Sequence, residues 1–486
     1  MKEYLEKILH YTAGNLLQKL ILLALLPVFT HFLVPQEYAV YTNVVVFISF
    51  AGLLYFLGFQ QAIFSYFYQK KTPEYHYTLI SSIFISIIGI GIVLSLLIVI
   101  FRVELSQLIL RSPDYAYIMV WVSVILFFDV IYGMVLSILN MMERSKQYII
   151  VGNFKHILLL ILLIVAAIAS RFSLGTILIL MTVSSALAAL VAVGVMSSIL
   201  RDFATQITEK RIFSFPLVRK LLSFGLIMIP GTFAMLILKV SDRYMLTYLS
   251  ARSLYDVGIY AIGYRIGMII TFLNSIVSLV YFPYAMRVAD DSHAKYSFKK
   301  VFNSYVLFGG MLGFFVILFS PEIFKIFINK SYHEAIKIVF FGVISNYLYG
   351  IFNIINLSFY VKKRAGNIAL AVGLGAILNI VLNFMLIPKY GIYGAGIASI
   401  LAFGLIVIFN FVIAEKTYRV GYNFLYILTS VIILILIAAV PFFVQYELYQ
   451  TFAKIALLCI VSIITYLYFR RTGKISQLLN RSGSSI

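Results

Sequence analysis

The sequence predicts an all-α polytopic membrane protein with about 14 transmembrane helices, and three observations support this prediction. Apolar stretches of roughly 20 residues, long enough to cross the hydrocarbon core as helices, follow one another through almost the whole chain. The 486 residues are 62% hydrophobic and 12% charged, which is more apolar than an ordinary soluble domain. Lysine and arginine, finally, concentrate in alternate connections between the apolar stretches.

The apolar stretches give the helices in order along the chain. The first one is too long to be the apolar region of a cleavable signal peptide, so we expect the first helix itself to direct insertion. The connections are short and leave no room for a large domain outside the membrane. The predicted spans are 12–33, 38–62, 77–101, 115–140, 148–170, 173–200, 221–247, 254–281, 300–320, 333–360, 365–387, 391–414, 424–444 and 451–469.

Every second connection is rich in cations, and the connections between them are poor in cations. By the positive-inside rule, this pattern places both termini and the basic connections in the cytoplasm. It also explains most of the net charge of +20, so that charge does not indicate nucleic-acid binding. The basic connections contain Lys70 and Lys71; Arg144 and Lys146; Arg201 to Lys220; Arg287 to Lys300; Lys362 to Arg364; Lys416 and Arg419; and Arg470, Arg471 and Lys474.

The longest polar connection follows the sixth span and divides the chain into lobes. It predicts an N-lobe of six helices at residues 1–210, a C-lobe of six at 211–420, and two extra C-terminal helices with a basic cytoplasmic tail at 421–486. Glu37-Tyr38-Ala39-Val40-Tyr41 opens the second span as Asp256-Val257-Gly258-Ile259-Tyr260 opens the eighth, which indicates an internal repeat. Chance similarity between apolar segments is the alternative. Repeated lobes in transporters enclose a binding site near the membrane midplane.

Three cations lie deep inside predicted spans, namely Lys19, Lys155 and Arg265. A charged side chain at the bilayer centre costs about 2.5–3.5 kcal/mol on insertion-based scales, so each cation needs a partner or a wet cavity. Lys19 in the first span and Arg265 in the eighth are placed to line a cavity between the lobes. The alternatives are ion pairing with Asp129 and, for Lys155, snorkelling to the cytoplasmic face.

Asp129 is the one carboxylate deep in a predicted span. An unpaired carboxylate there would be protonated or would hold a cation, so Asp129 is our candidate for ion coupling. A structural salt bridge with a buried cation explains it equally well.

The seventh span carries further polar and helix-bending residues. Lys239, Asp242 and Arg243 lie close to its outer end. We expect Asp242 and Arg243 to fix the helix end through mutual or cross-lobe ion pairing. Lys239 could form the outer edge of a substrate path across the membrane. Pro230-Gly231 falls mid-span, where the proline removes a helical hydrogen bond and the glycine permits a bend. This pair is a candidate hinge, although static bundles contain such kinks too.

Asparagines also occur within the apolar spans. They could bind a polar substrate such as a sugar, but interhelical hydrogen bonding explains them as simply. The 35 tyrosines and 42 phenylalanines are consistent with aromatic belts at both membrane interfaces. The asparagines concerned are Asn274, Asn353, Asn356, Asn379 and Asn383.

Three segments resemble a known family. Ser241-Asp242-Arg243-Tyr244-Met245-Leu246, followed by Asp256-Val257-Gly258-Ile259-Tyr260-Ala261, is similar to the seventh and eighth helices of polysaccharide flippases in the multidrug/oligosaccharidyl-lipid/polysaccharide (MOP) exporter superfamily. Leu378-Asn379-Ile380-Val381-Leu382-Asn383 and the following residues to Ala398 resemble the helix-11/12 hairpin of the same family. In helix count and spacing the resemblance extends from near Tyr11 to about Phe469.

The resemblance implies a V-shaped, two-lobed flippase in the cytoplasmic membrane of a bacterium or archaeon. Such a flippase carries an undecaprenyl-pyrophosphate-linked oligosaccharide from the inner to the outer leaflet, beside glycosyltransferases and a polymerase, with H⁺ or Na⁺ as a possible coupling ion. The diphosphate would then bind in a cationic cavity formed by Arg265, Lys19 and Lys155, with Lys239 at its lip. Arginine suits this group because its fork donates bidentately, and lysine adds a mobile point charge.

Other functions remain as alternatives. One is a transporter of the same architecture, either an ion-coupled drug or small-molecule antiporter or a peptidoglycan lipid-precursor flippase. The buried charged residues are mostly basic, which favours an anionic lipid-linked substrate over a small-molecule one. Another is a membrane glycosyltransferase, polymerase or ligase, which the short outer connections disfavour; the most polar is Arg111-Ser112-Pro113-Asp114-Tyr115. The chain has no P-loop motif. We expect no catalytic residue, cofactor or metal site, since His333-Glu334 lacks the second histidine of a zinc-protease helix and Cys459 is the only cysteine.

Overall fold

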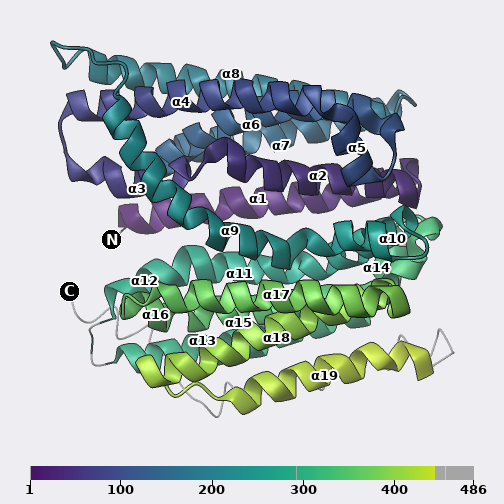
Figure 1. Cartoon of the computed structure of the whole chain (residues 1–486). Coiled ribbons are helices and arrows are strands. Elements are labelled where there is room, and N and C mark those ends of the chain that lie inside the picture. The colour runs from purple at the N-terminus through teal and green to yellow at the C-terminus, as the bar shows by residue number, and fades with distance from the viewer. Residues whose placement is uncertain (1, 290, 292, 444–454, 456–486) are drawn as a thin grey trace.

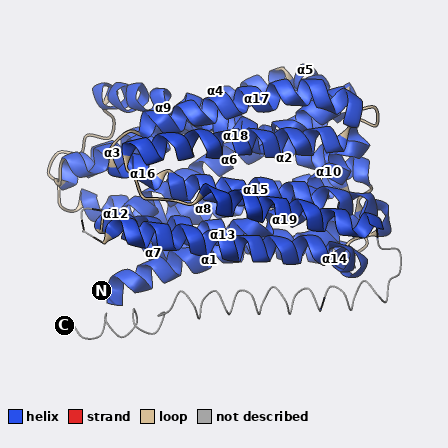
Figure 2. Cartoon of the chain, turned by 90° about the horizontal axis from the view of Figure 1, so that it is seen from below, coloured by secondary structure: helices blue, strands red, loops and turns tan. Residues whose placement is uncertain are grey.

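The computed structural model describes residues 2–289, 291, 293–443 and 455, and it consists of helices with short connections (Figure 1; Figure 2). No strand occurs in these residues. Their 12 helical stretches that are long and apolar enough to cross a membrane match the first 12 predicted spans, so the predicted class of all-α polytopic membrane protein is confirmed. The predicted span 424–444 corresponds to α19 (Phe424–Phe443). The predicted span 451–469, with Cys459, lies outside the described residues.

The first eight helices form one group, which occupies the upper half of Figure 1. We call it the N-terminal group. It consists of α1 (Lys2–Phe32), α2 (Pro35–Phe56), α3 (Phe59–Tyr66), α4 (Pro73–Ile100), α5 (Arg102–Leu110), α6 (Ala116–Met141), α7 (Ser145–Ile168) and α8 (Leu174–Ala204), with the single turns η1 (Phe67–Gln69) and η2 (Pro113–Tyr115).

The helices from α10 onward form the C-terminal group in the lower half of Figure 1. The predicted lobe boundary at residues 210–211 lies in the connection between α8 and α9. The group consists of α10 (Leu254–Gly267), η3 (Met268–Ile270), α11 (Thr271–Ile276), η4 (Val277–Tyr281), α12 (Phe282–Arg287), α13 (Ala294–Leu318), α14 (Ser320–Phe327), η5 (Lys330–Ile338), α15 (Val339–Ile355), α16 (Leu357–Val361), α17 (Ala365–Tyr390), α18 (Ile392–Thr417) and α19.

Helix α9 (Phe215–Leu249) crosses from one group to the other (Figure 1). Its first turns contact the N-terminal group, since the ring of Phe224 lies 6.0 Å from that of Tyr66. Its last turns contact α17, where Ser241 donates a hydrogen bond to Asn379 at 3.1 Å. One helix therefore bridges the two groups.

The eighth predicted span, 254–281, is not one regular helix. The chain passes from α10 through the 3₁₀ turn η3 and the short α11 into η4, which is a π-helical turn. Such irregular turns move carbonyl groups off the regular hydrogen-bond ladder and often occur at functional sites. This segment lines the candidate site described below.

Residues 102–110 also differ from the prediction, because they form α5 where the sequence analysis expects a connection. The nine residues are too short to span a membrane, so hydropathy does not reveal them. Helix α5 contacts the end of α9: Tyr248 donates a hydrogen bond to the carbonyl of Leu108, and Arg111 donates one to the carbonyl of Thr247 at 3.2 Å.

Glycines permit a close backbone contact at each end of the bundle: one joins the two groups, and the other joins the N-terminal group to the first turns of α9. At the end that the loop charges predict to be outer, a Cβ on Gly258 would lie 2.0 Å from the carbonyl oxygen of Pro35. At the opposite end, a Cβ on Gly225 would lie 2.8 Å from the main chain of Gly58, which itself has a φ of +76°. Only glycine lets the backbones approach this closely.

Three charged residues at the predicted outer end form a paired cluster. Arg252, in the turn between α9 and α10, donates two hydrogen bonds to Glu334 at 2.7 and 2.9 Å and lies 2.7 Å from the carboxylate of Asp256. The hydrogen bonds to Glu334 raise the pKa of Arg252 above its ordinary value. This cluster ties the start of α10 to η5.

Candidate functional site: a cationic cavity between the two groups

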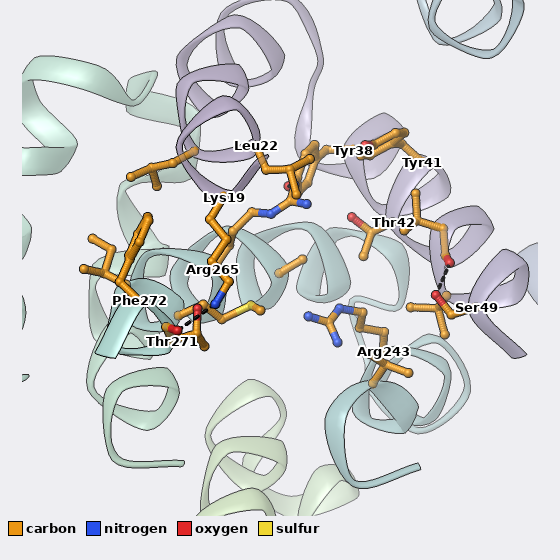
Figure 3. A pocket seen from close by; sticks show the side chains of 17 residues that line it. Lys19, Leu22, Tyr38, Tyr41, Thr42, Ser49, Arg243, Arg265, Thr271 and Phe272 are labelled. Atoms are coloured by element: carbon orange, nitrogen blue, oxygen red, sulfur yellow. Dashed lines mark hydrogen bonds between the residues drawn. The ribbon is translucent and has the colours of Figure 1, made fainter. Parts of the chain in front are cut away.

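A cavity of about 260 Å³ lies where α1 and α2 face α9 and the irregular segment α10–α11 (Figure 3). A second cavity of about 470 Å³ adjoins it and extends to α15 and α18. The two cavities share the lining residues Lys19, Val240, Arg243, Met268 and Thr271. Helices of both groups therefore enclose these adjoining cavities.

Four cations line this space: Lys19, Lys239, Arg243 and Arg265. No aspartate or glutamate is among the lining residues of either cavity. Figure 3 shows Lys19, Arg243 and Arg265 entering the first cavity from different helices. Among the ion pairs of the described residues, none involves these four side chains. The space consequently carries an uncompensated positive charge.

The Lys19 ammonium binds the irregular segment. It donates a hydrogen bond to the main-chain carbonyl of Thr271 at 2.6 Å and a second one to the hydroxyl of Ser275. It also lies 5.9 Å from the centroid of the Phe272 ring. These uncharged partners hold the amine in the cavity without neutralising its charge.

Arg265 lies on α10 and is half-buried. Its guanidinium donates a hydrogen bond to the hydroxyl of Tyr38, on α2, at 2.9 Å. Because α2 and α10 belong to different groups, this bond crosses between them. A guanidinium carries five N–H donors, so others remain for a ligand in the cavity.

Arg243 and Lys239 lie one turn apart on α9. Arg243 donates to the Lys239 carbonyl at 3.2 Å, and its guanidinium carbon lies 5.8 Å from the Tyr264 ring centroid. The Lys239 ammonium donates to the hydroxyl of Tyr349 at 3.2 Å and lies 4.3 Å from that ring centroid. Arg243, which the sequence analysis expects to be structural, thus lines the cavity with the other cations.

The expected ion pairing between Asp242 and Arg243 is wrong. Asp242 instead accepts hydrogen bonds from Tyr260 at 2.7 Å, Asn383 at 2.9 Å and Ser399 at 2.6 Å. Successive side chains on a helix point about 100° apart, so Asp242 faces α10, α17 and α18 while Arg243 faces the cavity. Asp242 is buried and ties α9 to the C-terminal group.

Lys155 does not join the other cations. Its ammonium lies 2.5 Å from the carboxylate of Asp129, which joins α7 to α6 within the N-terminal group. Neither residue lines the cavities. The structure therefore places Lys155 outside the expected cationic cavity, and the salt bridge that the sequence analysis kept as the alternative is present.

We predict that Asp129→Asn lowers the Tm of the purified protein, because it leaves the Lys155 ammonium without its carboxylate among apolar helices. The cost is about 3 kcal/mol or less, since both side chains keep some exposure. The double variant Asp129→Asn/Lys155→Met removes both charges and should regain most of the Tm. Equal Tm values for the single and double variants would contradict this account.

Four residues that line the cavities are not among the binding residues that the sequence predicts. Tyr38 and Tyr41 line the first cavity, and Asn346 and Tyr349 line the second. The two N-terminal tyrosines lie in the motif repeated between the lobes, which could have drawn attention to them. The other two require knowing which face of α15 meets empty space.

Comparison with known families and structures agrees with the fold. A sequence model described as polysaccharide biosynthesis protein matches residues 4–289, more than half of the chain. The chain belongs to this family. This polysaccharide biosynthesis protein has 12 helical stretches among its described residues that are long and apolar enough to cross a membrane, as expected of a multi-pass membrane protein.

Solved structures with the same fold include a lipid flippase and a drug transporter. The lipid II flippase MurJ, in an inward closed conformation, superposes with a TM-score of 0.70 and 16% identity, covering 94% of this polysaccharide biosynthesis protein and 98% of MurJ. An inward-facing multidrug resistance MATE family transporter of the MOP superfamily gives a TM-score of 0.62 and 13% identity, covering 83% and 96%. These identities are low, so the likeness concerns the fold alone.

A curated relative matches part of the chain. An uncharacterized membrane protein of Methanocaldococcus jannaschii is 30% identical over 215 residues, which are 42% of this chain. The chain spans 40% of the length of that relative.

Proposed function

We propose that the protein flips undecaprenyl-pyrophosphate-linked oligosaccharide units from the inner to the outer leaflet of the cytoplasmic membrane of a prokaryote, for polysaccharide synthesis. The observation that carries this proposal is the cavity with four cations and no lining carboxylate. A polysaccharide unit on a lipid diphosphate combines a strongly anionic group with sugars, and both must cross a medium of low dielectric constant. A cationic, enclosed space lowers the cost of that crossing.

The kinds of cation fit a diphosphate. Arg243 and Arg265 supply planar forks that bind phosphate oxygens bidentately, and Lys19 and Lys239 supply mobile ammonium groups. A small cationic drug would be repelled by the same four charges. The cavity therefore favours the lipid-diphosphate flippase over the antiporter of the same fold.

Alternating access requires the two groups to separate at one end of the bundle at a time. The bridging helix α9 connects the groups: its first turns contact the N-terminal group, and its last turns contact α17 as well as α2 and α5, so a relative movement of the groups must bend or shift this helix. Pro230 and Gly231 lie between these parts. They are our proposed hinge, and Asp129 is our proposed site of coupling to a proton or sodium gradient.

We predict that Gly231→Ala slows translocation several-fold without lowering stability. A Cβ at Gly231 would meet no heavy atom within 4 Å, so the substitution changes only backbone freedom. Alanine should stabilise the helix by up to about 1 kcal/mol, which opposes bending. Tm and translocation rate are the measurements, and an unchanged rate would count against a hinge at this position.

The experiment that tests the proposed function is a leaflet assay in liposomes that contain the purified protein. Fluorescent undecaprenyl-diphosphate oligosaccharide is placed in one leaflet, a sodium or proton gradient is imposed, and arrival in the other leaflet is followed by quenching. Protein-dependent translocation supports the flippase. Its absence with folded protein and a gradient, together with gradient-driven export of a small cation, would favour the antiporter.

The same assay tests ion coupling and can be extended to partners. Asp129→Asn/Lys155→Met, which should fold, is expected to translocate without gradient dependence. Unchanged gradient dependence would exclude Asp129 as the coupling residue. In cells, the flippase would act between glycosyltransferases that build the unit and a polymerase that consumes it.

A further inference from the structure

Helix α15 turns a polar face toward the second cavity. Between residues 341 and 355 of this helix, every residue is buried except Asn346, Tyr349 and Asn353. The spacing of three and four residues places these side chains on one face, and all three line the cavity. The only part of this stretch that meets open space is therefore polar.

These three side chains keep hydrogen-bond donors or acceptors that no described residue uses, so they can bind a ligand. Asn353 has no hydrogen-bond partner among the described residues, although it lies inside a membrane-spanning helix. The Tyr349 hydroxyl accepts a hydrogen bond from the Lys239 ammonium, and its own proton has no acceptor among the described residues. Asn346 uses its amide nitrogen to donate to the Gly342 carbonyl. An unpaired amide at this depth is costly unless water or a ligand binds it.

The polar face begins beside the cationic cluster. Lys239 contacts Tyr349 directly, and Arg243 and Lys19 line the same cavity. A diphosphate held by the cations would therefore have its attached group beside α15. Along the helix, Asn346 and Asn353 are about 10 Å apart, so the face extends beyond the length of one functional group.

The geometry points to α15 as the sugar-binding surface of the cavity, with Asn346, Tyr349 and Asn353 contacting the first hexopyranose rings next to the diphosphate. This inference rests on the proposed flippase function. An amide both donates and accepts, so it can bind two neighbouring sugar hydroxyls, and the Tyr349 hydroxyl can donate to a third. A few placed polar groups in a largely apolar pocket are what gives such sites specificity.

Binding of defined lipids to the purified protein tests the inference. The probes are undecaprenyl diphosphate bearing one glucose, galactose or N-acetylglucosamine, and sugar-free undecaprenyl diphosphate. We expect Asn353→Leu and Tyr349→Phe each to weaken binding of the preferred sugar-bearing lipid about tenfold, while affinity for the sugar-free lipid stays within about twofold. Tyr349→Phe keeps the ring and its packing, so it tests the inference even if Asn353→Leu does not fold.

Two controls separate this inference from the proposed function. Asn140→Leu makes the same substitution at an exposed position that lines neither cavity, and it should bind all probes as the wild type does. Arg265→Ala should lose both kinds of lipid. Equal loss of both lipids in the α15 variants, or no loss of either, would overturn the sugar-binding role and leave the flippase proposal standing. Failure of the wild-type protein to bind any undecaprenyl diphosphate would overturn both.

Discussion

Replacing Arg265 with alanine is expected to reduce translocation of the lipid-linked oligosaccharide about 100-fold. The guanidinium lies in the cavity with three other cations and no carboxylate, so its loss removes a charged, bidentate partner of the diphosphate. Losing one partner of an enclosed charge pair costs about 3 kcal/mol, which corresponds to that factor. Arg265→Lys keeps the charge without the fork and should retain part of the rate. Initial rates in the liposome assay measure both effects.

Other variants distinguish a binding role of Arg265 from a structural one. Tyr38→Phe removes the hydrogen bond between α2 and α10 but keeps the guanidinium, so most of the transport should remain. Arg102→Ala removes an exposed arginine of α5 that lines neither cavity, and it should leave the rate unchanged. If Tyr38→Phe lost as much transport as Arg265→Ala, the bond between the groups rather than the charge would be the important feature.

The sequence predicts the fold from its apolar stretches, and it predicts three of the four cavity cations: Lys239 as the lip of a path, and two others because a charge within an apolar span is visible without a structure. Lys19 and Arg265 stand out in this way, and the structure brings both to the cavity. Arg243 lies closer to a span end, where a charge is cheap, and only the rotation of α9 about its axis decides that Arg243 faces the cavity while Asp242 faces other helices. Sequence spacing predicts neighbours on one helix, but it does not orient that helix.

Contacts between helices explain the other differences. Lys155 and Asp129 each look like an isolated charge, and their pairing depends on how α6 and α7 are shifted along each other. Asn346, Tyr349 and Asn353 form a polar stripe that can be seen in the sequence. Polar stripes also occur where one helix hydrogen-bonds to another, as Asn379 and Asn383 of α17 do with Ser241 and Asp242 of α9. Whether such a stripe binds a ligand or a neighbouring helix depends on whether a cavity or another helix faces it.

Substituting glycines at the two ends of the bundle is expected to open the protein at opposite ends. A Cβ on Gly258 would lie 2.0 Å from the Pro35 carbonyl oxygen, and a Cβ on Gly225 would lie 2.8 Å from the main chain at Gly58. Both obstacles are backbone atoms that no rotamer change can move, and overpacking costs about 1–3 kcal/mol. Gly258→Ala should therefore separate α2 from α10 at the predicted outer end, and Gly225→Ala should separate α3 from α9 at the other end. Each should slow transport at least about tenfold, because a cycle needs both the outer closure between the groups and the attachment of α9 to the N-terminal group.

Distances between spin labels measure this difference in the Cys459→Ser background. Labels at the exposed residues Val34 and Phe327 report on the predicted outer end, and labels at the exposed residues Lys71 and Lys220 report on the contact between α3 and α9 at the other end. Gly258→Ala should lengthen only the first distance, and Gly225→Ala only the second. Gly194→Ala, whose Cβ would meet nothing within 4 Å, is the matched control and should change neither. If both glycine variants lowered the Tm but left the two distances as in the wild type, the glycines would serve packing alone and the contacts at the two ends would not be gates.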